Sequence, residues 1–154
     1  MGFLKVKADK HGYTLLELIV VIALFAVILS ISFPGIKSII ISMEKRELME
    51  LKRDIVYARN SAIVENLNYS FMVNKGKNTY SITRQEKVSK IIKKVKLENG
   101  IKIVSNNFGN SLTFTPSGAP AGGGTLELTN KKGQSIEISI TPATGKVNIY
   151  VDRR

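Results

Sequence analysis

The chain has 154 residues, a formal net charge of +11 and no cysteine. Its length suits one domain plus an anchor, and the missing cysteines exclude disulfides and thiolate chemistry. Because there is also only one histidine, an ordinary zinc site is excluded, and we expect neither a metal nor another cofactor. The basic balance favours anionic partners such as a membrane surface or nucleic acid, unless it serves solubility alone.

The chain begins with a short basic segment followed by an apolar run. Lys5, Lys7 and Lys10 precede the run, which extends from Leu15 to Phe33 and contains Glu17 and two serines. About 19 residues of helix, at ~1.5 Å per residue, are enough to cross a bilayer. Lysines on the N-terminal side predict that this end stays in the cytoplasm and that the rest of the chain faces out.

Three interpretations of this segment compete. A signal peptide would explain the small-residue triplet at Ser30 and Ser32, but the run is longer than the usual apolar core of a signal peptide. A plain single-pass anchor leaves Glu17 at a depth where a carboxylate costs roughly 3 kcal/mol or more. In the third interpretation, a prepilin leader is cleaved after Gly12 and the apolar helix stays in the mature protein.

The residues that carry the third interpretation run from Gly12 to Glu17 and read Gly-Tyr-Thr-Leu-Leu-Glu. They resemble the type IV prepilin signature, with Tyr13 where phenylalanine is more usual, and Pro34 lies where that family usually has a proline. The resemblance implies cleavage after Gly12 by a prepilin peptidase, N-methylation of Tyr13 and a helix held in membrane lipid before assembly. We favour this interpretation because the motif is contiguous and stands in the right context.

The resemblance also gives Glu17 a function. Cleavage after Gly12 would create an amino group on Tyr13, and in a filament Glu17 of one subunit would meet the Tyr13 amine of its neighbour. Opposite charges in an apolar setting attract strongly, whereas one charge left alone is heavily penalised. Glu17 would therefore set the register between neighbouring helices, and Glu17 and Pro34 are the predicted assembly residues.

Beyond Phe33 the apolar pattern becomes amphipathic, which predicts a helix with one buried stripe. The predicted stripe consists of Ile36, Ile40, Met43, Leu48, Leu51, Ile55, Ala58 and Ala62. Acidic and basic residues alternate between these positions and are interpreted as ion pairs along the helix surface, not as a catalytic group. We expect one helix from about Tyr13 to Asn66, kinked or opened at Pro34.

From Asn68 onward the apolar residues alternate, which predicts strands. The expected strands are Tyr69–Val73, Thr79–Thr83, Ile91–Leu97, Ile101–Val104, Leu112–Phe114, Leu126–Leu128, Ile136–Ile140 and Val147–Val151. Turn residues predict hairpins at 74–78 and 130–134, and a further turn at 98–100.

The predicted fold class is α+β, with a long N-terminal helix packed on an antiparallel β-sheet head. The first half of the helix is expected to span the membrane and the second half to be amphipathic. The expected parts are a leader at residues 1–12, an assembly helix at 13–34, the helix of the head at 35–67 and the β-rich head at 68–154.

Several stretches of the head are similar to the minor pseudopilins of the GspH/FimT type. These stretches are Ala58–Ile63, Phe114–Gly118, Leu126–Leu128, Lys131–Gly133, Ile136–Ile140 and Thr144–Val147. The resemblance implies a low-abundance subunit that helps to initiate or tip a filament in secretion, pilus biogenesis or competence. Its partners would be other pilin or pseudopilin subunits. Its location would be the inner membrane, with the head outside, and then the filament.

The sequence contains no complete catalytic motif. The stretch from Gly118 to Thr125 approaches a phosphate-binding loop, but Gly124 stands where the lysine is needed. The only histidine, His11, belongs to the expected leader. We therefore expect no enzyme.

The alternative function is a DNA-binding minor pilin at a filament tip. The candidate phosphate contacts are Lys90, Lys93, Lys94, Lys96, Arg153 and Arg154. Such contacts would weaken steeply as salt rises. No series of aromatic residues is interleaved with them, so stacking on bases is not supported, and solvated lysines are the simpler interpretation.

Overall fold

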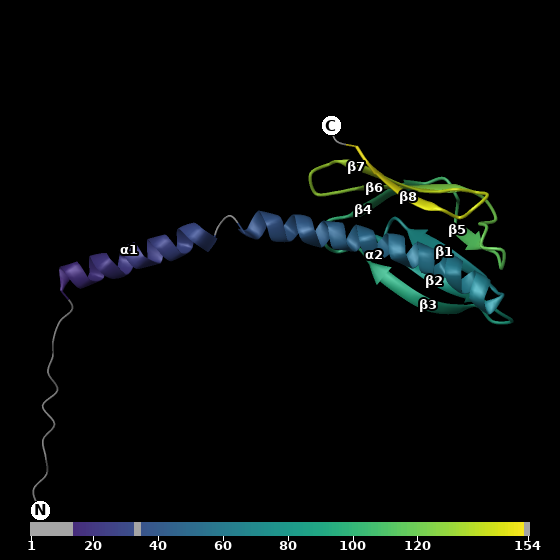
Figure 1. Ribbon diagram of the computed structural model, residues 1–154, viewed down its shortest axis with the longest axis horizontal. Helices are drawn as coiled ribbons and strands as arrows, with labels where there is room; N and C mark the ends of the chain where they lie inside the picture. Colours follow the sequence, from purple (N-terminus) through teal and green to yellow (C-terminus); the bar gives the residue numbers. More distant parts are fainter. Residues whose placement is uncertain (1–13, 33–34, 153–154) are drawn as a thin grey trace, which may run out of the picture. The chain divides into compact units, whose positions relative to one another are not determined.

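The computed structural model describes residues 14–32 and 35–152 of the chain. The chain forms two compact units, Met1–Ile39 and Ile40–Arg154. The first contains helix α1, and the second contains most of helix α2 together with all the described strands (Figure 1).

Helix α1 spans Leu15–Ser32. Thr14 caps its N-terminus, because the Thr14 Oγ1 atom accepts a hydrogen bond of 3.2 Å from the backbone N–H of Glu17. In the part of the chain that the structure describes, no helix is long and apolar enough to cross a membrane. The last residue of the predicted span, Phe33, and the predicted break at Pro34 lie outside the described residues.

Helix α2 spans Gly35–Glu65 and packs on the head through one stripe of small and apolar residues. Its buried apolar members are Leu48, Leu51, Ile55, Ala58 and Ala62. The prediction was wrong for Met43, whose side chain is 45% exposed, because the stripe continues towards the N-terminus through Glu44 and Glu47 instead. The side chains of Ile36 and Ile40 lie outside those described.

The C-terminus of α2 is closed by a left-handed residue. Asn66 has a φ of 54°, and the N–H of Leu67 donates to the carbonyl of Ala62 at 3.3 Å. This six-residue closure is the Schellman arrangement, in which asparagine replaces the more common glycine. It turns the chain directly into the first strand.

Within the described residues, eight strands form two antiparallel sheets of four. Their bounds are β1 Asn68–Asn74, β2 Thr79–Gln85, β3 Lys90–Lys96, β4 Lys102–Asn106, β5 Ser111–Phe114, β6 Gly124–Thr129, β7 Ser135–Ile140 and β8 Val147–Val151. The first sheet has the order β3-β2-β1-β5 and the second the order β4-β6-β7-β8. The α+β fold class is confirmed, and the antiparallel head is divided between two sheets.

The two predicted hairpins are confirmed by the strand register. Asn74 pairs with Thr79, and Thr129 pairs with Ser135. The turn at 98–100 does not form a hairpin, because β3 and β4 belong to different sheets. Here the Asn78 side chain donates to the carbonyls of Leu97 and Ile101, each at 2.8 Å. These bonds satisfy polar groups that a hairpin would have paired with each other.

One hydrophobic core joins α2 and both sheets. The first sheet contributes Tyr69, Phe71, Tyr80, Ile82, Leu112 and Phe114, and the second contributes Ile103, Leu126, Leu128, Ile136, Ile138, Ile140 and Val147. The rings of Phe71 and Tyr80 lie 5.5 Å apart, within the range of favourable aromatic pairs. Alternation along each strand places these residues on the inward faces of their sheets.

Candidate assembly surfaces

The first candidate surface is the apolar exterior of α1. Its large side chains are exposed on all sides, from 43% at Val21 to 75% at Leu15. A helix that is apolar all round belongs in an apolar environment. Burying one such side chain fully is worth roughly 1.5–3 kcal/mol. The surface of α1 is therefore a candidate for burial against other apolar groups.

Glu17 lies on the exposed first turn of this helix. Its spacing from Thr14 is that of a capping box, in which the two residues satisfy N–H groups at the helix start. A carboxylate near a helix N-terminus is stabilised by about 0.3–1 kcal/mol. The bond observed here uses the backbone N–H of Glu17, so the Glu17 carboxylate stays free for the predicted intersubunit contact. Gly12, Tyr13 and Pro34 lie outside the described residues.

The predicted basic residues do not share one face. Lys93 points to the helix side of β3, where its Nζ atom lies 3.0 Å from Glu50 Oε1 and 2.8 Å from Asp54 Oδ2. Burial lowers the pKa of Lys93, but the hydrogen bonds to Asp54 and Glu50 raise it by more, so that it stays charged. Lys93 is therefore a counterion of α2.

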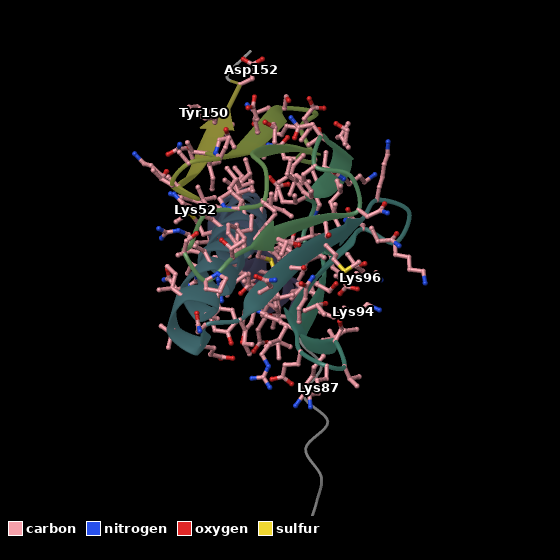
Figure 2. All side chains as sticks on the ribbon, turned by 90° about the vertical axis from the view of Figure 1, so that its right-hand side faces the viewer. Lys52, Lys87, Lys94, Lys96, Tyr150 and Asp152 are labelled. Atoms are coloured by element: carbon pink, nitrogen blue, oxygen red, sulfur yellow. The ribbon has the colours of Figure 1, made fainter. Side chains whose placement is uncertain are left out.

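Lys94 and Lys96 lie on the outer face of the same strand, where they pair with Ser81 and Thr79. Figure 2 shows the two lysines on the same side of the head. Lys96 also forms an exposed ion pair of 2.9 Å with Glu98. Lys90 is exposed and is separated from Lys94 and Lys96 by a shift in the register between β2 and β3. Arg153 and Arg154 lie outside the described residues.

A second group of functional side chains was missed by the sequence interpretation: the acids of α2. Glu47 is only 7% exposed, and its carboxylate accepts hydrogen bonds from the backbone N–H groups of Glu98 at 2.7 Å and Asn99 at 3.0 Å. It also accepts one from the N–H of Ile101 at 3.3 Å. One carboxylate thereby fixes the whole crossover between the two sheets to α2.

Asp54 performs a similar role for strands β2 and β3 of the first sheet. It is 7% exposed and accepts a hydrogen bond of 2.6 Å from the Tyr80 hydroxyl as well as one of 2.9 Å from Lys93. Burial and the hydrogen bond to Asp54 together raise the pKa of Tyr80 far above its usual range. The triad of Asp54, Tyr80 and Lys93 ties β2 and β3 to the helix.

These contacts correct the prediction of ion pairs along the surface of α2. Glu47, Glu50 and Asp54 reach across to the head, so the basic residues of the helix are not neutralised by them. Within the described residues, no ion pair is formed by Lys45, Arg46, Lys52 or Arg53. The signal was present in the sequence, because Glu44, Glu47 and Asp54 share the three- and four-residue spacing of the buried stripe.

Three of the stretches that resemble minor pseudopilins meet at the end of α2. Arg59 donates from Nε to the carbonyl of Gly118 at 3.1 Å. A Cβ on Gly145 would lie 2.6 Å from that same carbonyl oxygen and 2.9 Å from Arg59 Cδ. Gly118 and Gly145 also have positive φ values of 78° and 63°. Both positions therefore require glycine for conformation and for space.

Comparison with known proteins gives two matches to family models. The model described as type II transport protein GspH matches residues 47–144, more than half of the chain. The model described as a prokaryotic N-terminal methylation motif matches residues 7–33. No curated protein matches the chain.

Solved structures share the fold. The minor pseudopilin EpsH from the type 2 secretion system of Vibrio cholerae is 12% identical with a TM-score of 0.56, covering 74% of this chain and 97% of its own. The type IV minor pilin FimU of Pseudomonas aeruginosa is 20% identical with a TM-score of 0.57, covering 71% of this chain and 97% of its own. A second crystal form of FimU gives 18% identity and a TM-score of 0.58, covering 71% of this chain and 92% of its own.

Proposed function

The chain belongs to the family of the type II transport protein GspH, and from that premise we propose that it is a minor pilin or pseudopilin. It would be a structural subunit, without catalytic activity, of a type IV pilus, a type II secretion filament or a competence filament. The observation that carries this proposal is α1, whose apolar side chains are exposed on every side and so require a lipid or helical environment.

The proposed processing follows from the N-terminal segment. A prepilin peptidase would cleave after Gly12 and methylate Tyr13, a proposal supported by the match of residues 7–33 to a methylation motif. The resulting parts would be a leader at 1–12, an assembly helix at 13–34, the helix of the head at 35–67 and the head at 68–154. Before assembly the chain would sit in the inner membrane with its N-terminus in the cytoplasm and its head outside.

Glu17 is the proposed assembly residue. It is the only acid in α1, and it lies in a helix whose other side chains are almost all apolar. In lipid a lone carboxylate is costly, whereas the Tyr13 amine of a neighbouring subunit would neutralise it. Methylation of that amine preserves its charge. The pairing would therefore favour the assembled state and define one register between the helices, with Pro34 as the second proposed assembly position.

The test begins with the intact mass and N-terminal sequence of the chain recovered from membranes. We expect a chain that begins at Tyr13, with or without one methyl group. A chain that begins near Phe33 would instead identify an ordinary secreted domain. A chain that begins at Met1 would identify a plain membrane anchor. Either of these two results would refute the processing and the function of Glu17 proposed above.

DNA binding at a filament tip is the alternative, and the geometry favours it less. Lys93 is held by two carboxylates, and Lys96 is paired with Glu98, so among the candidates that the structure describes only Lys90 and Lys94 form no ion pair. Salt-dependent binding of the full chain in detergent to duplex DNA would support the alternative. An absence of binding at low salt would remove it.

A further inference from the structure

Strand β8 is an unprotected edge of the second sheet. The other three edges carry features that discourage strand addition: four lysines on β3, a register shift in β4, and a short β5 whose Phe114 bridges to Pro120. Strand β8, in contrast, pairs with β7 in regular register and contains no charged residue between Val147 and Val151. Of the four sheet edges, β8 therefore has the fewest features that would prevent another strand from pairing with it.

The hydrogen-bonding groups of this edge are directed outward. The N–H of Asp152 donates to Ser135, and the N–H of Thr141 donates to Lys146, both at 3.0 Å. In an antiparallel ladder the bonded positions alternate, so the even-numbered residues of β8 bond to β7. The N–H and carbonyl groups of Ile149 and Val151 therefore face away from β7, where an added strand would meet them.

An apolar groove lies beside this edge, between β8 and α2. Its volume is ≈ 390 Å³, and Ile41 and Met49 line it from the helix while Ile136, Ile149 and Val151 line it from the sheet. Ile41, Met49 and Val151 remain 47%, 44% and 45% exposed. Side chains of a strand added to β8 would alternate between this groove and the opposite face of the sheet.

The charge of the groove specifies the chemistry of its occupant. Lys45 and Lys52 line it together with one acid, Glu44, so the charges that line it sum to a positive value. Arg46 and Arg53 line a neighbouring hollow on the same helix and add to that positive charge. No ion pair neutralises these four cations within the described residues. Strand β8 of a second copy, docked edge to edge, has no acidic residue and is followed by one, Asp152, which is too few for these four cations. An occupant with carboxylates would satisfy them.

We propose that β8 and the adjoining groove form a docking site for an extended segment of another protein, with alternating apolar residues and with aspartate or glutamate. The segment adds as a fifth strand beside β8, places its apolar side chains in the groove and turns carboxylates towards Lys45 and Lys52. Main-chain hydrogen bonds supply affinity, and the groove and the cations supply specificity. In Figure 2, Tyr150 of β8 and Lys52 lie on one side of the head, opposite Lys94 and Lys96.

The experiment is photo-crosslinking from the groove in the full chain in its native membranes. Benzoylphenylalanine replaces Met49, and the adduct is mapped by mass spectrometry. The control photoprobe replaces Ile91, which is 60% exposed on the lysine-rich edge. We expect an adduct from position 49, but not from 91, on a peptide of another protein with alternating apolar and acidic residues.

Two backbone variants test strand addition itself. Val151→Pro removes an outward N–H that β7 does not use, whereas the matched Val151→Ala retains it. Loss of that one hydrogen bond should lower the adduct yield roughly three- to tenfold in the proline variant only. Because Val151→Pro could also disturb β8, Lys45→Glu with Lys52→Glu provides a second variant that leaves every strand bond intact and should also lower the yield.

Any other pattern overturns the inference. An adduct on a second copy of this chain, on lipid or on a helical segment would identify a different occupant. The absence of an adduct, or equal yields in wild type, Val151→Pro and the charge-reversed variant, would exclude strand addition. Failure of the proposed pilin function is distinguishable, because it appears in the mass and first residue of the chain and not in the adduct.

Discussion

Replacing Glu47 by alanine would remove the acceptor for three backbone N–H groups. The N–H of Ile101 is buried, and those of Glu98 and Asn99 are partly buried. An unsatisfied buried donor costs about 1–3 kcal/mol, while a donor that water can reach costs less. We therefore expect Glu47→Ala to lower the free energy of unfolding of the head by about 2–4 kcal/mol.

Glu47→Gln is the sharper change because it preserves volume. Glu47 Oε1 receives the bonds from Glu98 and Asn99, and Oε2 receives the bond from Ile101. A glutamine can offer its one oxygen to the first pair, but its amide nitrogen then faces the N–H of Ile101. We expect Glu47→Gln to lower the free energy of unfolding by about 1–2 kcal/mol, which is less than the loss expected for Glu47→Ala.

The assay is urea unfolding of the full chain in detergent, followed by circular dichroism, together with amide exchange at 98, 99 and 101. Glu98→Gln is the control, since it removes only the exposed pair with Lys96 and should leave the transition unchanged. Faster exchange at all three amides should accompany the loss of stability. If both Glu47 variants have the same urea midpoint as the wild type, the carboxylate does not hold the crossover, and the reasoning fails.

The remaining predictions address glycine, pH, the helix cap and DNA. Gly145→Ala should destabilise the head by about 1–3 kcal/mol more than Gly109→Ala, because both residues have positive φ but only Gly145 has neighbours that a Cβ would meet; urea midpoints compare them. Tyr80, whose pKa is raised, loses its proton in the unfolded chain first, so stability should fall as pH rises above about 10, and Tyr80→Phe should flatten that fall in a pH series of unfolding curves. Glu17→Gln, which removes the charge but keeps the backbone N–H, should abolish incorporation into filaments, whereas Thr14→Val, which removes only the cap, should reduce it slightly; incorporation of Glu17→Gln at the wild-type level in sheared filaments would refute the intersubunit pairing. Lys94→Ala with Lys96→Ala should leave duplex-DNA retention at low salt unchanged, and a clear drop in a filter-binding assay would restore the alternative function.

Local patterns in the sequence were sufficient to predict the elements of the fold. Alternating residues such as Ile136, Ile138 and Ile140 mark strands because one face of each sheet is buried. The turn residues at 74–78 and 130–134 predict hairpins because their conformational needs are local. The α+β class follows from one long helical pattern and a series of short strands.

The division into two sheets was not predictable in the same way. The turn at 98–100 has the composition of a hairpin, yet the strands on either side separate. The deciding contacts come from residues distant in sequence, namely Glu47 on the helix and Asn78 in an earlier turn. Patterns of residues close in sequence carry no information about such contacts. The pairing of distant segments is therefore known only from the structure.

The charged residues of α2 show how a wrong prediction of ion pairs leads to a wrong expectation about the protein surface. If the acids paired with the basic residues beside them, the helix would present a neutral surface. Glu47, Glu50 and Asp54 instead bind groups of the head and hold the crossover and the first sheet to the helix. Their carboxylates therefore do not pair with the basic residues of α2. Lys45 and Lys52 are left without an ion pair in the groove beside β8, which Glu44 also lines, and Arg46 and Arg53 lie in the neighbouring hollow of the same helix. The contacts that stabilise the head thus also leave these cations available to the acidic segment proposed above.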